Sequence, residues 1–217
     1  MNENFWYIYG AGGLGVETMD VLQAAISQGA QESPRLAFLV DDPKCDEVLG
    51  RPVIAVGHHV VGARVTIAVG EPLDRAALGE KVGKLGLKLA SVISPSAFVS
   101  RFAEIGNGVI IGPHVSVQAT AKIGNNVAIN TAAIIGHDVV VKENCVISSM
   151  VNLGGGVHVE ALSYIGMGAL IREKLHVGGS SIVGMGAVVH SDVPSEVIVV
   201  GNPARVVRRN EEKKVFR

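Results

Sequence analysis

A histidine and an aspartate stand side by side in a stretch that is otherwise mostly small or aliphatic, INTAAIIGHDVV from Ile129 to Val140. The chain has seven histidines, and only His137 is followed directly by an acid. A carboxylate next to an imidazole stabilises the protonated form and raises its basicity, which suits a general base near neutral pH. We therefore predict that His137 is a general base tuned by Asp138. The alternative is an ordinary exposed pair.

These two residues lie within a repeat of six. An aliphatic residue recurs at every sixth position from Ile93 to Val189, and a second small or aliphatic residue follows each of them by four. A helix has a period of about 3.6 and a half-buried strand a period of about 2, so neither explains the pattern. It predicts a solenoid in which each hexad forms one flat face and three faces complete a coil, with Gly and Asn at the corners.

The coil arithmetic predicts which residue faces the imidazole. Three hexads after His137 the chain reads NLGGGV, so Gly155 falls one coil on, at the same corner. A glycine N–H beside the base could stabilise the oxyanion of an acyl transfer; the alternative is that the glycines only ease the corner. Cys145 falls in the second inward series and Cys45 in a charged loop, so we expect direct transfer rather than a covalent acyl-enzyme.

The residues before the repeat read as alternating strands and helices. FWYIYGAGGLGVETMDVLQAAI predicts a buried strand, a glycine turn and a helix, and RLAFLVDD and ARVTIAVGEP predict further strands of a small parallel sheet. Gly10, Gly12 and Gly15 satisfy G-x-G-x-x-G at the turn, so a helix N-terminus could face a phosphate. A tight turn without a ligand is the alternative. The region supplies only about half of a doubly wound fold, which favours a single nucleotide-like ligand over a dinucleotide.

Composition narrows the class of protein. The formal net charge is −1 without a long block of like charge, which argues against nucleic-acid binding. The two cysteines cannot build a disulfide scaffold and lack the spacing of a zinc site. No apolar run has the length of a membrane span or a signal peptide. We expect a cytoplasmic protein without a metal, whose core is Val, Ile, Ala and Leu because aromatics make up only 4%.

Residues 93–194 resemble the hexapeptide repeats of left-handed parallel β-helix acyltransferases. The whole chain resembles the group of sialic acid O-acetyltransferases and nucleotide-sugar N-acetyltransferases, the latter including the bacillosamine and perosamine types. The resemblance implies a left-handed coil and a homotrimer with active sites between neighbouring solenoids. It also implies three parts: a Rossmann-like α/β domain that binds the nucleotide sugar (1–90), a left-handed β-helix acetyltransferase domain (91–194) and a C-terminal segment (195–217).

The resemblance assigns roles to individual residues. The family motif N-T-x-x-x-I-x-H-D/E reads NTAAIIGHD here, so His137 and Asp138 would be the base and its partner, and Asn130 would position the acceptor or a water. Many N-acetyltransferases of the group have a histidine where this chain has Leu14. The residues that match the family's contacts to the sugar nucleotide are Gly12, Gly13, Leu14, Asp41, Asp42 and Gly70.

The cosubstrate implied by the resemblance is acetyl-CoA. The residues that would contact it are Gly155, Met167, Met185, Val146 and Arg205. Relatives often have a histidine at the position of Val146, so the contacts would differ there. The ending GNPARVVRRNEEKK resembles the family's G-x-P-A-[KR] segment, in which Arg205, or else Arg208 or Arg209, could meet coenzyme phosphates. Solvated surface arginines are the alternative.

The implied function is acetyl-CoA-dependent acetylation of the amine of a nucleotide-linked amino sugar. Leu14 leaves room for a second possibility, transfer to a sugar hydroxyl as in the sialic acid O-acetyltransferases. A third, the zinc-dependent γ-type carbonic anhydrases, needs a pair of histidines five residues apart, but Ala132 and Lys142 stand at those positions around His137. A fourth is a noncatalytic scaffold.

Overall fold

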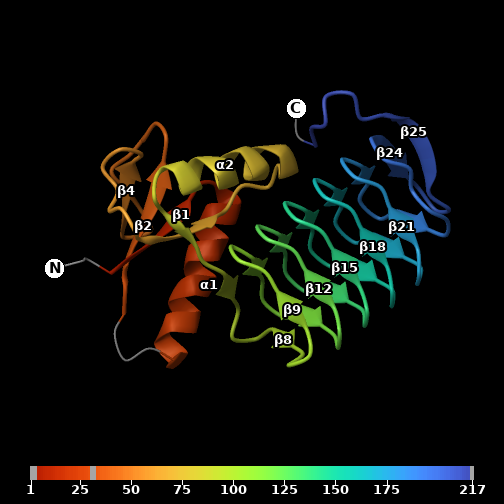
Figure 1. The fold of residues 1–217 in the computed structure, drawn as a ribbon, viewed down its shortest axis with the longest axis horizontal. Coiled ribbons are helices and arrows are strands. Elements are labelled where there is room, and N and C mark those ends of the chain that lie inside the picture. Colours follow the sequence, from red (N-terminus) through yellow and green to blue (C-terminus); the bar gives the residue numbers. More distant parts are fainter. Residues whose placement is uncertain (1–3, 30–32, 216–217) are drawn as a thin grey trace.

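The N-terminal part of the chain forms a six-stranded sheet with two helices. The computed structural model describes residues 4–29 and 33–215, and Figure 1 shows this sheet at one end of a long solenoid. The strand order is β3-β4-β2-β1-β5-β6; the β3–β4 pair is antiparallel and the other pairs are parallel. The elements are β1 (Phe5–Tyr9), α1 (Gly13–Gly29), β2 (Arg35–Val40), β3 (Glu47–Val48), β4 (Arg51–Ala55), β5 (Arg64–Ile67), α2 (Pro72–Lys84) and β6 (Lys88–Leu89).

The central strands of this sheet are short apolar runs, as parallel strands between covering helices require. Tyr7, Ile8 and Phe38 are fully buried. Helix α2 begins with Pro72, whose missing N–H breaks no hydrogen bond because the first turn of a helix has no partner for it. The helix ends near Lys81 and Lys84, whose positive charges interact favourably with the negative end of the helix dipole. The predicted alternation of strands and helices is therefore present.

The rest of the chain winds into a solenoid whose three faces are parallel sheets. Each strand pairs with the strand one coil on, 18 residues later, as Ile110 does with Ala128; in the last pair the offset is 16, from Ile182 to Ile198. Face 1 consists of β7 (Val92–Ile93), β10 (Ile110–Ile111), β13 (Ala128–Ile129), β16 (Val146–Ile147), β19 (Tyr164–Ile165), β22 (Ile182–Val183) and β24 (Val197–Val200). Face 2 consists of β8 (Phe98–Val99), β11 (Ser116–Val117), β14 (Ile134–Ile135), β17 (Asn152–Leu153), β20 (Leu170–Ile171) and β23 (Val188–Val189). Face 3 consists of β9 (Glu104–Ile105), β12 (Lys122–Ile123), β15 (Val140–Val141), β18 (His158–Val159) and β21 (His176–Val177).

Turns join the faces along the edges of the prism, and two of these edges matter below. Corner 1–2 joins face 1 to face 2 and contains residues 94–97, 112–115, 130–133, 148–151, 166–169 and 184–187. Corner 2–3 joins face 2 to face 3 and contains residues 100–103, 118–121, 136–139, 154–157, 172–175 and 190–193.

The aliphatic series of period six forms the core of the solenoid, as its spacing predicted. Ile111, Ile129 and Ile147 are each 0% exposed. Burying such a side chain contributes about 1.5–3 kcal/mol, and the stack repeats that contribution in every coil. Ile93 differs because no earlier coil packs on it, and it remains 37% exposed.

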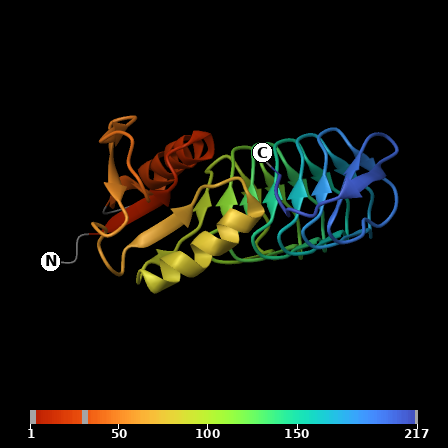
Figure 2. The same cartoon turned by 90° about the horizontal axis from the view of Figure 1, so that it is seen from above.

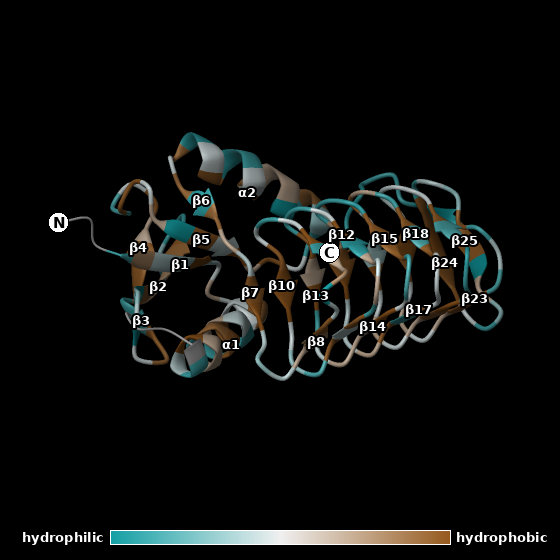
Figure 3. Ribbon diagram, turned by 60° about the horizontal axis from the view of Figure 1, so that its bottom comes forward, coloured by the Kyte–Doolittle hydropathy of each residue, from teal (hydrophilic) through white to brown (hydrophobic). Residues whose placement is uncertain are grey.

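The N-terminal unit is docked on face 1 of the solenoid. The outward side chains of Val92, Ile110, Ala128 and Val146 are buried in one apolar cluster with residues of β1, β2 and α1. Figure 3 shows α1 beside β7 and β10. Figure 2 shows the N-terminal sheet and α2 next to the first coils of the solenoid, with β24, in blue, at the far end. The two units therefore share a core, and their relative position is fixed by packing.

A buried arginine joins the two units. Arg75 of α2 is 0% exposed; its Nε and Nη2 donate to the backbone and side-chain oxygens of Asn126 on the solenoid, both at 2.9 Å. Its Nη1 donates to the carbonyls of Ile67 and Val69, at 2.8 and 3.0 Å. Burial lowers the pKa of Arg75 to about 9, which still leaves the guanidinium charged at neutral pH.

The C-terminal segment closes the far end and then returns. Strand β25 (Arg205–Arg209) pairs antiparallel with β24 at the edge of face 1. Further on, the Val215 N–H donates to the Glu71 carboxylate at 2.9 Å, so Val215 lies beside the start of α2 (Figure 1). Among the described residues, neither helix has the length and apolarity to cross a bilayer.

Candidate functional site

The predicted base lies at corner 2–3 in a fixed hydrogen-bond chain. The Thr120 hydroxyl donates to Asp138 Oδ1 at 2.6 Å, and Asp138 Oδ2 lies 2.8 Å from His137 Nδ1. The Thr120 hydroxyl, and then His137, hold the pKa of the Asp138 carboxyl below its usual value. An ionised carboxylate can only accept, so Nδ1 carries the proton and Nε2 is left to act as the base.

Access to the imidazole is open. The side chain of His137 is 66% exposed and that of Asp138 is 63% exposed, so a substrate can approach Nε2. Asp138 has a φ of +59°, a left-handed conformation that aspartate tolerates better than most residues. In this turn the Asp138 carboxylate points toward the imidazole of His137.

Gly155 lies against the same imidazole, as the coil arithmetic predicted. A Cβ added to it would be 2.5 Å from His137 Nε2 and 2.6 Å from Cε1, whereas its φ is not in the left-handed region that requires glycine at Gly156. The backbone is held there because Gly156 N–H donates to the His137 carbonyl at 2.8 Å. The ring, rather than the shape of the corner, therefore excludes a side chain at Gly155.

The glycines of the first turn divide in the same way. Gly10 has a φ of +106°, and a Cβ on Gly15 would meet the Gly10 carbonyl oxygen at 2.1 Å, so both are needed for the tight packing of strand and helix. A Cβ on Gly12 or Gly13 would meet nothing within 4 Å. The turn does not require glycine at these two positions; they leave the N-terminus of α1 open to a ligand.

The acids predicted to contact a nucleotide lie at the end of β2. Asp41 accepts from the Tyr9 hydroxyl at 2.9 Å and from the Lys81 ammonium, and the Lys81 ammonium is the main reason that the pKa of Asp41 is lowered. A cavity of about 360 Å³ opens beside Tyr9, Asp41 and Gly10. Asp42 instead forms an exposed ion pair with Lys44. The cavity's lining residues are Tyr9, Gly10, Val40, Asp41, Val69, Asp74, Ala77 and Leu78, and Gly70 is next to one of them in the chain.

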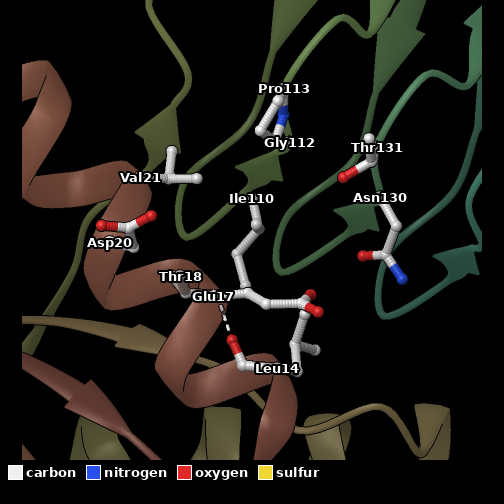
Figure 4. Close-up of a pocket in the computed structure, with 10 residues that line it drawn as sticks. All are labelled: Leu14, Glu17, Thr18, Asp20, Val21, Ile110, Gly112, Pro113, Asn130 and Thr131. Atoms are coloured by element: carbon white, nitrogen blue, oxygen red, sulfur yellow. Dashed lines mark hydrogen bonds between the residues drawn. The ribbon is translucent and has the colours of Figure 1, made fainter. Parts of the chain in front are cut away.

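A second cavity, of about 220 Å³, separates α1 from corner 1–2. We call it the α1 cleft, and Figure 4 shows its lining. It brings Leu14 of the glycine turn together with Asn130 of the family motif. The lining residues are Leu14, Glu17, Thr18, Asp20, Val21, Ile110, Gly112, Pro113, Asn130 and Thr131.

The residues predicted to hold the coenzyme are spread over the molecule. Met167 and Met185 are 56% and 80% exposed on corner 1–2, stacked one coil apart because Gly186 N–H donates to the Met167 carbonyl at 2.9 Å. Val146 is only 2% exposed, within the apolar cluster against which Leu14 packs. Arg205 is exposed on β25 at the end of face 1.

The predicted site residues therefore occupy two different edges of one chain. His137, Asp138 and Gly155 lie on corner 2–3, while Asn130 and the two methionines lie on corner 1–2. Face 2 separates the two corners. No single chain brings the motif's Asn130 to its histidine.

Sequence reasoning missed three residues near these sites. Thr120 stands one coil before Asp138, so the same arithmetic that found Gly155 could have found it. Arg75 and Glu17 gave no such signal, because their surroundings depend on how the N-terminal unit docks on the solenoid. Among the described residues, the structure groups no set of three or more His, Cys, Asp or Glu that could hold a metal ion.

Comparison with solved structures finds similar proteins over nearly the full length of the chain. A histidine-to-asparagine variant of perosamine N-acetyltransferase from Caulobacter crescentus, in complex with CoA and GDP-perosamine, is 30% identical, with 93% of this chain and 95% of that chain covered and a TM-score of 0.85. WeeI from Acinetobacter baumannii is 31% identical, with 94% and 99% covered and a TM-score of 0.86. The acetyltransferase domain of PglB from Neisseria gonorrhoeae, in complex with acetyl coenzyme A, is 30% identical, with 94% and 99% covered and a TM-score of 0.71. No family model and no curated protein matches the sequence.

Proposed function

The chain belongs to the hexapeptide-repeat nucleotide-sugar N-acetyltransferases, and we propose that it transfers the acetyl group of acetyl-CoA to the amine of a nucleotide-linked amino sugar. The observation that carries this proposal is the geometry at His137. An ionised carboxylate holds one ring nitrogen, and the other faces solvent beside a glycine backbone. The relatives point to the substrates, since the Caulobacter enzyme was solved with CoA and GDP-perosamine.

The reaction needs one base and one oxyanion donor. The acceptor amine attacks the carbonyl carbon of the thioester, a C–N bond forms, and His137 Nε2 takes a proton from the nitrogen. The tetrahedral oxyanion is stabilised by the Gly155 N–H. When it collapses, the C–S bond breaks and the sulfur takes the proton from the imidazolium, so the free thiol of CoA leaves. Asp138 stabilises that imidazolium and keeps the ring in its tautomer.

A homotrimer would complete the site. Because Asn130 and His137 lie on different corners, the motif functions as a unit only if corner 1–2 of one copy meets corner 2–3 of another. The outward side of face 2, between these corners, supports such a contact: Phe98, Ile134 and Leu170 are 63%, 39% and 46% exposed. These three side chains lie on alternate coils of one face, with Ser116 and Asn152 on the coils between them. Exposed apolar side chains grouped on one face mark an interface more often than scattered ones do.

The remaining parts of the proposal concern binding. The N-terminal sheet, over residues 1–90, acts as a Rossmann-like nucleotide-binding domain, with the diphosphate at Gly12 and Gly13 and the nucleoside near Asp41 and Gly70. The solenoid, over 91–194, coils left-handed and carries the coenzyme along Met167 and Met185, and the segment 195–217 contributes Arg205. Leu14 and Asp42 belong to this proposal as contacts to the nucleotide sugar, whereas Val146, buried under the N-terminal unit, offers no surface to the coenzyme.

A panel of UDP-, GDP- and dTDP-linked amino sugars tests the function. We expect acetyl-CoA-dependent thiol release with at least one of them, and a product heavier by one acetyl group by mass spectrometry. A second candidate function is transfer to a sugar hydroxyl. It is favoured by Leu14, which packs against apolar neighbours at the position where many N-acetyltransferases of the group have a polar histidine. Acetylation of hydroxyl acceptors without turnover of any amino sugar would establish that candidate instead.

A further inference from the structure

Glu17 stands on the wall of the α1 cleft that faces the solenoid. Leu14, Glu17 and Val21 line the cleft together because residues three and four apart share one face of a helix. Figure 4 shows the Glu17 side chain reaching from α1 toward Asn130, with the apolar side chains of Ile110 and Leu14 on either side of it. The carboxylate therefore lies between two apolar side chains and points toward the motif asparagine.

Within the part of the chain that the structure describes, no other group binds the Glu17 carboxylate. Across residues 4–29 and 33–215, Glu17 forms no hydrogen bond or ion pair, and the lining of the cleft contains no lysine, arginine or histidine. A surface acid without a partner is common, but this one lines a cavity shared with Asn130. It is thus available to a positively charged or hydrogen-bond-donating ligand.

The distance along α1 fits a sugar attached to a bound diphosphate. Helix α1 begins at Gly13, which like Gly12 leaves the helix N-terminus open to a ligand. Glu17 lies about one turn further, or roughly 5–6 Å along the helix axis. That is about the width of a pyranose ring. A sugar whose diphosphate lies at the N-terminus of α1 would therefore place a ring substituent near Glu17 and Asn130.

We propose that Glu17 is the specificity-determining residue that binds the ammonium group of the acceptor sugar. This inference rests on the proposed function. Leu14 cannot make a polar contact with the amine, and Glu17, one turn on and on the same helix face, provides one. A carboxylate binds an ammonium group more strongly than a hydroxyl because the hydrogen bond is charge-assisted on both sides. Glu17 would therefore favour amine over hydroxyl acceptors in the initial complex. The bound ammonium group then releases one proton to solvent, and the neutral amine attacks the thioester with His137 of a second copy as the base.

The test compares Glu17→Gln with Glu47→Gln. Gln has nearly the helix propensity of Glu, so the first variant should fold. The second removes the same charge from the exposed Glu47 of the edge strand β3, which does not line the α1 cleft. The probes are the best nucleotide amino sugar of the panel and its 4-hydroxy counterpart. We expect Glu17→Gln to raise the KM for the amino sugar about 10- to 100-fold, with the KM for acetyl-CoA unchanged and Glu47→Gln like the wild type.

Calorimetry without acetyl-CoA separates this inference from the proposed function. The wild type should bind the amino sugar more tightly than the hydroxy sugar, and Glu17→Gln should bind both alike. If the wild type acetylates the amino sugar but Glu17→Gln keeps both the KM and the binding preference, the role of Glu17 is refuted while the function stands. If the wild type neither binds nor acetylates any amino sugar, both are refuted.

Discussion

The two edges of the solenoid that carry site residues are built in opposite ways. Corner 2–3 is assembled from one structural unit, with Thr120, Asp138, His137 and Gly155 stacked by the repeat itself. The α1 cleft is assembled from two units, a helix of the N-terminal sheet and the turns of corner 1–2. The repeat alone determines the geometry of the first, whereas the geometry of the second depends on docking.

This difference separates chemistry from recognition. A base must be held within a fraction of an ångström, and stacked coils do so because each turn is bonded to the next. A recognition cleft between two units can change its lining without disturbing the base. Variants on the two edges should therefore differ in kind: those at corner 2–3 should lower kcat, and those at the cleft should raise the KM for the acceptor.

The largest expected effect comes from removing the base. His137→Ala should lower turnover about 100- to 10,000-fold, the usual contribution of general-base catalysis, while calorimetry shows unchanged binding of the nucleotide sugar. His158→Ala, an exposed histidine on face 3, is the matched control and should keep full turnover. Equal rates for the His137 variant and the wild type would remove corner 2–3 from the mechanism and favour a noncatalytic scaffold.

Gly155→Ala tests whether the imidazole and the glycine backbone work as one unit. The added Cβ would lie 2.5 Å from His137 Nε2, so either the imidazole or the Gly155 backbone must shift. Because either shift separates the base from the oxyanion donor, kcat should fall about 100- to 1,000-fold. Gly83→Ala in α2 is the control, since its Cβ would meet nothing within 4 Å and alanine suits a helix. Normal kcat in the Gly155 variant, measured by thiol release, would contradict the contact.

Arg75→Met tests the docking on which the cleft depends. The substitution leaves the carbonyls of Ile67, Val69 and Asn126 without their donor, and each buried acceptor left unpaired costs about 1–3 kcal/mol. Removing the buried charge offsets part of this, so we expect the free energy of unfolding in urea to fall by about 2–3 kcal/mol. The KM for the acceptor should rise more than kcat falls.

Arg75→Lys refines the same test, because lysine keeps the charge but not the planar fork that reaches three carbonyls. It should also destabilise the protein. A stability equal to that of the wild type in both variants would show that apolar packing alone holds the two units together.

The contrast between the edges also explains what the sequence could predict. The hexad period predicted the solenoid, the inward series and the stacking of Gly155 on His137, because each follows from counting along one chain. The glycine turn was predicted, but only the structure separates Gly10 and Gly15, which packing requires, from Gly12 and Gly13, which it does not. The α1 cleft, Arg75 and Glu17 depend on the placement of one unit on another, and no periodicity encodes that placement.

The smallest expected effect sharpens the comparison, because it perturbs corner 2–3 without removing any group that touches substrate. Thr120→Val removes the hydroxyl that most lowers the pKa of Asp138, so that pKa should rise toward its usual value, as carboxyl NMR titration would show. The contribution of the ionised Asp138 carboxylate to the free energy of unfolding is fully present above its pKa in the unfolded protein, and it is lost as the pH falls through its pKa in the folded protein. Because the folded-state pKa is higher in the variant, the variant should lose this contribution at a higher pH. At neutral pH Asp138 stays ionised in both proteins, so kcat should fall less than about fivefold, a loss of under about 1 kcal/mol. A larger loss, with an unchanged carboxyl titration, would mean that Thr120 acts by another route than Asp138.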